Sequence, residues 1–248
     1  MRLPARLLVL GLVLQACATP HAAVEPAPAS TAVTFTEVSA TLEPDPELAA
    51  MVAPYAEELV ERTSEVVGYA EGEIREGRPE GPLGTFAAEA MLSQARKLSD
   101  RPVDMALTNN GGLRVPLGPG AITVGKMFEL MPFENMMIIL DLSAADVDSL
   151  AHQLARVGGD PIAGFSFVIT PDGRATDVRV SDEPLSSERT YRLVTSDYLA
   201  NGGGPYEVLW GEQSRQELTF LLRDAFTEHL REIETIRPRV DGLIRREQ

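Results

Sequence analysis

The sequence predicts an α+β domain built on mixed sheets. Segments in which apolar and polar residues alternate, as in half-buried strands, are interleaved with segments whose apolar residues recur every three or four positions, as in helices. The two kinds do not follow the regular strand–helix–strand order of a parallel α/β sheet. With 248 residues, of which 44% are hydrophobic, the chain can bury a sizeable core.

The first residues are typical of an export signal and not of a folded domain. Arg2 and Arg6 precede a short apolar run that ends at Cys17 in the pattern of a bacterial lipobox. We therefore expect residues 1–16 to be a lipoprotein signal peptide and residues 17–32, rich in Ala and Pro, to be a flexible tether from an acylated Cys17. The alternative is an ordinary secretory signal that is cleaved nearby. Because Cys17 is the only cysteine, a disulfide within the chain is impossible.

Residues 33–248 are predicted to form the folded domain. It begins with an alternating segment at 33–42, which predicts a strand, and continues with a helix. Asp45 is a suitable N-cap for that helix, and Pro46 suits its first turn. The buried face predicted for this helix consists of four apolar residues at helical spacing: Leu48, Val52, Tyr55 and Leu59.

The next elements lead to a loop rich in asparagine and glycine. A helix is expected from about residue 85 to residue 97, and a strand at 103–108 leads into the loop. A short helix at 124–130 and an apolar strand at 136–142 follow. The residues that the helix at 85–97 should bury are Phe86, Ala90 and Met91.

Capping patterns mark the following helix. Ser143 and Asp146 resemble a capping box, and the helix should end at Gly158-Gly159. Its expected core residues are Val147, Leu150, Ala151 and Leu154.

The last third of the chain reads as strands followed by a helix. A Pro-Asp-Gly turn joins strands at 165–170 and 175–180, and a further strand follows at 191–195. The last helix is expected to begin at Ser214, with Glu217 completing its cap. Its predicted core stripe is Leu218, Leu221, Leu222, Phe226 and Leu230.

Composition excludes some partners and finds no catalytic centre. The formal net charge of −15 argues against nucleic acid, because phosphate backbones attract clustered Lys and Arg. A few arginines can still bind one small anion, so a nucleotide ligand is compatible with this charge. His21, His152 and His229 belong to no metal-ligand motif, and the last two are expected on helix surfaces. The sequence contains no nucleophile elbow and no phosphate-binding P-loop.

The loop after residue 108 is suited to binding. Asn109 offers both a donor and an acceptor to the edge of a heterocycle. Gly111 and Gly112 allow the backbone to approach a ligand closely. Arg114 presents a planar fork that matches phosphate or ribose oxygens.

Two aromatic residues are placed in other loops. Phe133 precedes a strand, and Tyr198 begins a second glycine-rich loop that contains Gly203. Two such rings can clamp a flat base, and each stacking contact is worth about 1–3 kcal/mol in nucleic-acid binders. The alternative is that the glycine-rich loops are plain turns and that Phe133 is a core residue.

Four segments, in their order along the chain, resemble the C-terminal domain of the 5′-nucleotidase family, which includes periplasmic UDP-sugar hydrolases and cell-surface ecto-5′-nucleotidases. They read NNGGLR at Asn109–Arg114, MPF at Met131–Phe133, LANGG at Leu199–Gly203 and PRVDGLI at Pro238–Ile244. The resemblance covers nearly the whole chain after the tether. It implies a four-layer α/β/β/α fold and a role in recognising the substrate of a nucleotide hydrolase.

The resemblance also implies roles for single residues. In the family, the residue that matches Asn109 contacts the nucleoside, and aromatics that match Phe133 and Tyr198 sandwich the base. Arginines that match Arg114 and Arg78 meet the phosphate or ribose side.

Two departures from the family pattern stand out. Gly204 stands where the family usually has an Asp that holds the ribose hydroxyls, which puts the family's mode of ribose recognition in doubt for this chain. Full-length members also carry an N-terminal metallophosphatase domain whose two metal ions activate water, and this sequence has no ligand set for them. We therefore expect no cofactor in this chain and a divalent metal pair only in a partner.

Three functions remain open at this stage. The chain could be the recognition half of a 5′-nucleotidase, working with a separately encoded metallophosphatase. It could instead be a surface lipoprotein that binds nucleosides without turnover, or an interaction module that has lost its site. In each case we expect an exported bacterial lipoprotein, periplasmic or at the cell surface and anchored to the membrane through Cys17.

Overall fold

The computed structural model describes residues 35, 37, 39, 41–211 and 214–247. The signal peptide, Cys17 and the tether, all predicted within residues 1–32, lie outside the described residues. The chain divides into a unit at residues 1–46 and a unit at residues 47–248.

The strand predicted at residues 33–42 is not observed where this segment is described. Residues 35, 37, 39, 41 and 42 are described and are not in a strand, and the others lie outside the described residues. Alternation indicates which face of a strand can be buried, but a strand also needs a hydrogen-bonded neighbour. No strand of the three described sheets pairs with this segment.

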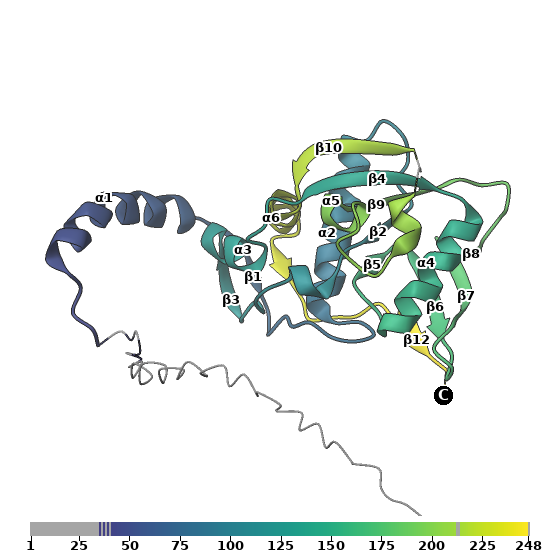
Figure 1. Ribbon diagram of the computed structural model, residues 1–248, viewed down its shortest axis with the longest axis horizontal. Coiled ribbons are helices and arrows are strands. Elements are labelled where there is room, and N and C mark those ends of the chain that lie inside the picture. Colours follow the sequence, from purple (N-terminus) through teal and green to yellow (C-terminus); the bar gives the residue numbers. More distant parts are fainter. Residues whose placement is uncertain (1–34, 36, 38, 40, 212–213, 248) are drawn as a thin grey trace, which may run out of the picture. The chain divides into compact units, whose positions relative to one another are not determined.

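The described residues form six α-helices and three sheets (Figure 1). The helices are α1 (Pro46–Thr63), α2 (Pro82–Leu98), α3 (Val124–Leu130), α4 (Ala144–Val157), α5 (Asp197–Ala200) and α6 (Leu222–Ile233). The strands are β1 (Val66–Ala70), β2 (Met105–Leu107), β3 (Gly120–Thr123), β4 (Met136–Leu142), β5 (Ile162–Ala163), β6 (Phe165–Ile169), β7 (Ala175–Val180), β8 (Glu183–Pro184), β9 (Tyr191–Ser196), β10 (Arg215–Leu221), β11 (Thr235–Ile236) and β12 (Ile244–Arg246).

Each sheet contains both parallel and antiparallel pairs. The central sheet has the order β10-β4-β9-β2-β5, and the others have the orders β11-β1-β3 and β12-β6-β7-β8. In the central sheet β2 runs parallel to β9, whereas β4 runs antiparallel to it. The predicted α+β class with mixed sheets flanked by helices is therefore confirmed.

The helices that the sequence marks by local signals begin and end close to the predicted residues. In α4, the side chains of Ser143 and Asp146 cap each other's backbone N–H groups. Gly158 ends α4 with φ 81, the left-handed conformation that glycine adopts without strain. Helix α2 begins three residues earlier than expected, at Pro82, which suits a first helical position.

The last helix begins later than predicted. Ser214 and Glu217 do not cap it, because residues Arg215–Leu221 form strand β10, which pairs antiparallel with β4. The physical reason is that without β10 one side of β4 would have no partner, and pairing with β10 satisfies the backbone hydrogen-bonding groups on that side. Leu222, Phe226 and Leu230 still form the buried stripe of α6.

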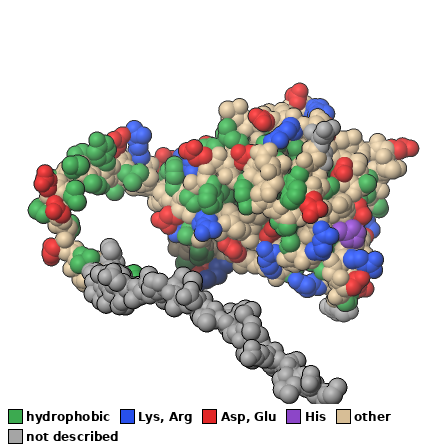
Figure 2. All heavy atoms as spheres, viewed as in Figure 1, with side chains coloured by type: hydrophobic (Ala, Val, Ile, Leu, Met, Phe, Trp, Pro, Cys, Tyr) green, Lys and Arg blue, Asp and Glu red, His purple; other side chains and the backbone are tan. Residues whose placement is uncertain are grey.

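The first helix is confirmed, but its predicted buried face is wrong. Helix α1 has no buried residue, and its hydrophobic side chains lie on the surface in Figure 2. The exposed fractions are Leu48 60%, Val52 57%, Tyr55 73% and Leu59 62%. An amphipathic stripe shows which face can be buried, but not whether the chain offers a surface to cover it. No described helix has both the length and the apolar character needed to cross a bilayer.

The central sheet is buried on both faces. Helices α2 and α6 pack together over one face, where the rings of Phe86 and Phe226 lie 6.2 Å apart. Helix α4 and the sheet that contains β6 and β7 cover the other face, and that second core includes Phe165 and Phe167. Because side chains pack on both faces, the central sheet is rigid, and it holds the ends of the loops that leave its strands in fixed positions.

Candidate functional site

The order and direction of the strands bring three predicted site residues to one edge of the central sheet. By edge we mean here the end at which β2 and β9 finish and β4 begins. Since β2 and β9 are parallel, Asn109 after β2 and Tyr198 after β9 lie at the same edge. Strand β4 is antiparallel to β9, so Phe133, which precedes β4, lies at that edge too. Strand β9 lies between the other two strands, and neighbouring strands are about 4.8 Å apart. The three loops therefore start within roughly 10 Å of one another along the sheet.

Gly111 and Gly112 lie close to the side-chain amide of Asn109. A Cβ added to Gly111 would lie 3.3 Å from Asn109 Nδ2, and one added to Gly112 would lie 3.5 Å from Asn109 Oδ1. Asn109 is half-buried, whereas Arg114 is exposed and donates from Nη1 to the Gly111 carbonyl at 3.1 Å. The amide and the guanidinium are thus held by the same short loop.

The buried carboxylate of Asp160 forms hydrogen bonds to this loop. Asp160, only 6% exposed, accepts hydrogen bonds from the Asn110 backbone N at 3.3 Å and from Asn110 Nδ2 at 2.9 Å. It also accepts from the hydroxyl of Tyr206. Burial, and then the charge of Asp160, raise the pKa of Tyr206 far above its ordinary value, so its hydroxyl stays a donor. No local pattern in the sequence marks Asp160, because its partners come from distant segments.

Arg78 forms an ion pair with the same carboxylate. Its Nη2 donates to Asp160 Oδ1 at 3.1 Å, and its Nη1 donates to the carbonyls of Val157 and Gly159. Arg78 therefore connects the end of α4 with the loop that follows β2 through Asp160. Its side chain remains 47% exposed, but in this structure two of its nitrogens already bond to protein oxygens.

The second glycine loop is shaped around an aromatic ring. Tyr198 is 48% exposed, and a Cβ added to Gly203 would lie 2.3 Å from two atoms of its ring. Trp210, which the sequence did not single out, is 47% exposed and lies against Gly202. At Gly204, where the family pattern has Asp, a Cβ would lie 2.7 Å from Leu199 Cδ2. A larger residue there would require the Leu199 side chain to shift.

Phe133 is not a core residue, so that alternative is wrong. Its side chain is 43% exposed, close to the value for Tyr198. Both rings are therefore accessible at the same edge of the central sheet.

The two histidines in the described part of the chain, His152 and His229, contact other residues of the fold. His152 Nδ1 accepts a hydrogen bond from the Ala175 backbone at 3.0 Å, which fixes its ring against β7. His229 packs against Phe86 at 6.0 Å, and its buried Nδ1 has no partner among the described residues. Burial lowers the pKa of His229. The sequence predicted His229 on the surface of a helix, whereas the structure shows it half-buried. Within the described residues, no group of three or more His, Cys, Asp or Glu side chains is placed to hold a metal ion.

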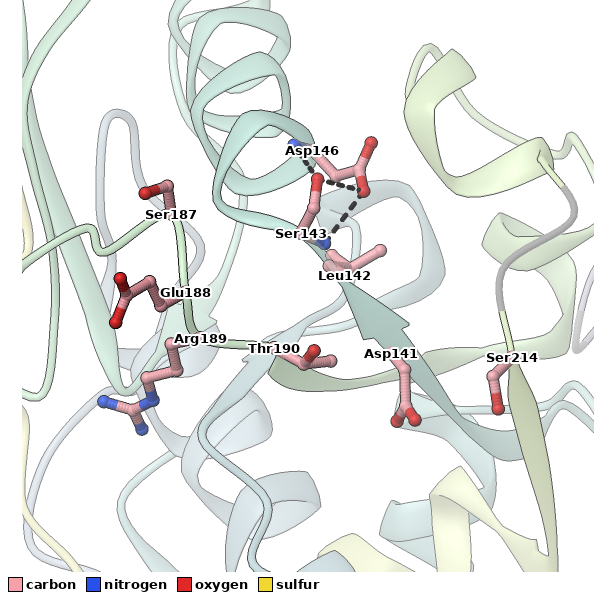
Figure 3. A pocket seen from close by; sticks show the side chains of 9 residues that line it. All are labelled: Asp141, Leu142, Ser143, Asp146, Ser187, Glu188, Arg189, Thr190 and Ser214. Carbon is pink, nitrogen blue, oxygen red and sulfur yellow. Dashed lines mark hydrogen bonds between the residues drawn. The ribbon is translucent and has the colours of Figure 1, made fainter.

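Three cavities in the described structure lie away from these loops. One of about 600 Å³ is at the opposite end of β4, where Asp141 and Leu142 meet the start of α4 (Figure 3). There Ser143 and Asp146 bond to each other as a helix cap, and Asp141 pairs with Arg192. Another of 420 Å³ adjoins the end of α4. None of them is lined by a predicted site residue.

The third cavity, of 1210 Å³, lies between α2, α6 and the segment that follows α6. Its basic side chains already have partners within the chain: Arg96 with the Val103 carbonyl, Lys97 with Glu232, Arg237 with Glu71 and Arg239 with Glu89. A charged ligand would have to compete with these bonds. The exposed loop side chains at the edge of the central sheet are therefore the better candidate site.

The chain is similar to known proteins over most of its length. Residues 62–210 match the family model for the 5′-nucleotidase C-terminal domain. The chain is 28% identical over 224 residues to the trifunctional nucleotide phosphoesterase protein YfkN of Bacillus subtilis, which covers 82% of this chain and 15% of that protein. It is 25% identical over 230 residues to the 5′-nucleotidase of Diplobatis ommata, covering 81% of this chain and 40% of the relative.

Solved structures show the same fold. The 5′-nucleotidase precursor from Thermus thermophilus superposes with a TM-score of 0.69 at 25% identity, covering 82% of this chain and 44% of that one. The NAD nucleotidase of Haemophilus influenzae has a TM-score of 0.64 at 19% identity, covering 82% and 42%. The chain thus spans less than half the length of each of these four proteins.

Proposed function

Because the chain belongs to the 5′-nucleotidase C-terminal domain family, we propose that it recognises a nucleotide or nucleoside with the loops at the edge of its central sheet. The main support is the convergence of Asn109, Phe133 and Tyr198 from three separate loops on that edge. Both rings are nearly half exposed and so are available for stacking on a base.

Each residue has a distinct task in this proposal. Phe133 and Tyr198 stack on the two faces of the base, and the Asn109 amide pairs with its edge. Arg114, held over the same loop, meets the phosphate or ribose oxygens. Arg78 acts on the ligand side only with its exposed part, since two of its nitrogens bond to protein oxygens.

We further propose that this chain supplies recognition and that a separate metallophosphatase chain supplies hydrolysis. The matched family model describes the C-terminal domain of a 5′-nucleotidase, which supports the first half of this statement. Phosphate monoester hydrolysis in such enzymes requires metal ions that activate water, and we assign that metal pair to the partner. The second candidate, which would use the same loop residues, is a lipoprotein that binds nucleosides without turnover.

Titration calorimetry with adenosine, AMP, UMP and a UDP-sugar tests nucleotide recognition. We expect saturable binding, and we expect Phe133→Ala and Tyr198→Ala each to weaken it about tenfold or more, the loss of one stacking contact. Tyr69→Ala is the matched control, because Tyr69 is 53% exposed but lies on β1 in another sheet. If neither loop substitution changes the affinity, the site is not where we place it.

Export and anchoring through Cys17 are also part of the proposal. The support is the lipobox-like pattern before Cys17, the only cysteine of the chain. Growth with labelled palmitate should label the native protein and not the Cys17→Ser variant. Equal labelling of both would show that Cys17 is not the anchor.

A further inference from the structure

Two rings can sandwich a flat base only if their spacing is fixed. The planes of the two rings must lie about 7 Å apart, twice the roughly 3.5 Å between the carbon atoms of stacked rings. Phe133 and Tyr198 lie on different loops, so each loop must be held in place relative to the other. Two charged side chains outside the predicted site, Asp197 and Arg223, form hydrogen bonds to these loops.

Asp197 connects the two loops directly. It is the first residue of α5, and one of its oxygens, Oδ1, accepts hydrogen bonds from the Tyr198 backbone N at 2.8 Å and from the Met136 backbone N at 3.1 Å. Met136 begins β4, three residues after Phe133. A single carboxylate oxygen therefore bonds to the backbone of one ring-bearing residue and to the end of the other ring's loop.

Arg223 holds the other end of the Phe133 loop. Its Nη1 donates to the Met131 carbonyl at 3.1 Å and to the Phe133 carbonyl at 3.5 Å. Its guanidinium carbon lies 3.9 Å from the centre of the Phe128 ring, a cation–π contact. The loop between Met131 and Met136 is thus pinned at both ends.

Burial of the Arg223 charge is unfavourable for stability, so packing alone does not explain this residue. It is only 7% exposed, no ion pair of Arg223 is found among the described residues, and its buried Nε has no hydrogen-bond partner there. A buried charge without a counter-ion is unfavourable compared with an apolar residue of similar size. Local violations of this kind are expected at functional sites.

We infer that Asp197 and Arg223 are positioning residues that set the spacing of a base clamp formed by Phe133 and Tyr198. Neither side chain needs to touch the ligand. This inference rests on the proposed function, and it adds the residues that make stacking on two separate loops possible.

Two substitutions of Asp197 separate positioning from mere presence. Asp197→Asn keeps a carbonyl oxygen in the place of Oδ1, whereas Asp197→Ala removes both hydrogen bonds. We expect Asp197→Ala to weaken adenosine binding about tenfold and Asp197→Asn to stay within about threefold of the unaltered protein. An Asn variant as impaired as the Ala variant, or an Ala variant that binds normally, would overturn the role of Asp197.

Amide hydrogen exchange gives a readout that needs no ligand. In Asp197→Ala the Met136 amide should exchange at least about tenfold faster, and in Asp197→Asn it should keep its protection. Unchanged exchange at Met136 in the Ala variant would overturn the coupling between the loops. If the unaltered protein binds no nucleoside, the proposed function and the clamp fail, while the exchange result still decides whether the loops are coupled.

Arg223 is tested with Arg223→Met, because a buried Met fills similar space and favours a folded variant. Thermal unfolding confirms that the variant is folded, and Asp224→Asn, at an exposed neighbouring residue, is the matched control. We expect adenosine binding to weaken about tenfold in Arg223→Met only. A folded Arg223→Met protein with normal affinity would remove Arg223 from the inference. Should the Met variant not fold, faster exchange in the Met131–Met136 loop of Arg223→Lys is the expected result, and unchanged exchange contradicts it.

Discussion

At the scale of single residues, the glycines of the candidate site keep space for the side chains beside them. Gly203 lies against the Tyr198 ring so closely that any Cβ would collide with it. A Cβ on Gly111 would make a tight contact of 3.3 Å with Asn109 Nδ2, whereas one on Gly112 would make an ordinary contact of 3.5 Å with Asn109 Oδ1. The second glycine-rich segment is therefore matched to an aromatic ring, which a plain turn would not require.

Gly203→Ala tests this role. The new Cβ would lie 2.3 Å from the Tyr198 ring, so the ring must move. We expect nucleoside affinity to fall about tenfold, one stacking contact, and stability to fall by about 1–3 kcal/mol from overpacking. Gly118→Ala is the control, since a Cβ there meets nothing within 4 Å and should leave both quantities nearly unchanged. Equal behaviour of the two variants in calorimetry and thermal unfolding would contradict this reading.

His229 makes stability sensitive to acid. Burial lowers its pKa in the folded state, Lys97 lowers it further, and Glu232 opposes the shift. Above the ordinary pKa of 6.5 the residue is neutral in both states, whereas below it the unfolded chain takes up a proton that the folded chain resists. The free energy of unfolding should therefore fall as the pH drops below 6.5.

The check is denaturant unfolding at several pH values for the native protein and for His229→Leu. The Leu variant should lose less stability than the native protein between pH 6.5 and the lower, folded-state pKa. Because the Nδ1 of His229 has no partner among the described residues, we expect no loss of stability from its removal at neutral pH. Parallel pH profiles for the two proteins would assign the acid sensitivity elsewhere.

At the scale of elements, helices with local signals were predictable and pairings between distant segments were not. The α4 helix carries its own start and stop in Ser143, Asp146 and Gly158. By contrast, Arg215–Leu221 has apolar residues that fit either a helix or a strand, and only the neighbouring edge of β4 decides for the strand. The stripe of α1 was read correctly as helical, but nothing in its own sequence shows whether a surface covers it.

Matched substitutions on α1 and α6 test this difference. Leu230 on α6 is fully buried, so Leu230→Ala should cost about 2–5 kcal/mol in the free energy of unfolding. Leu59 on α1 is 62% exposed, so Leu59→Ala should change stability by no more than about 0.5 kcal/mol. Urea unfolding of both variants provides the measurement. A large loss for Leu59→Ala would mean that α1 is covered in solution.

At the scale of the whole molecule, the sequence identified the residues of the candidate site better than their supports. Asn109, Phe133 and Tyr198 are recognisable by type and by neighbouring glycines, whereas their convergence on one edge follows only from the pairing of β2, β4 and β9. Asp160, Asp197 and Arg223 were missed because each is a single charged residue whose partners are distant in the sequence. Their effect depends on the assembled fold.

The proposed division of labour between two chains predicts a specific kinetic effect. Adding this chain to an exported metallophosphatase of the same cell should lower KM for AMP, because stacking on the base binds substrate and transition state alike. Two stacking contacts of about 1–3 kcal/mol each make a tenfold or larger fall in KM the expected result. Phe133→Ala should lose most of the gain and Tyr69→Ala none, since Tyr69 is on a different sheet. If no exported phosphatase gains activity at saturating amounts of this chain, while calorimetry still shows nucleoside binding, the chain acts as a binding protein without turnover.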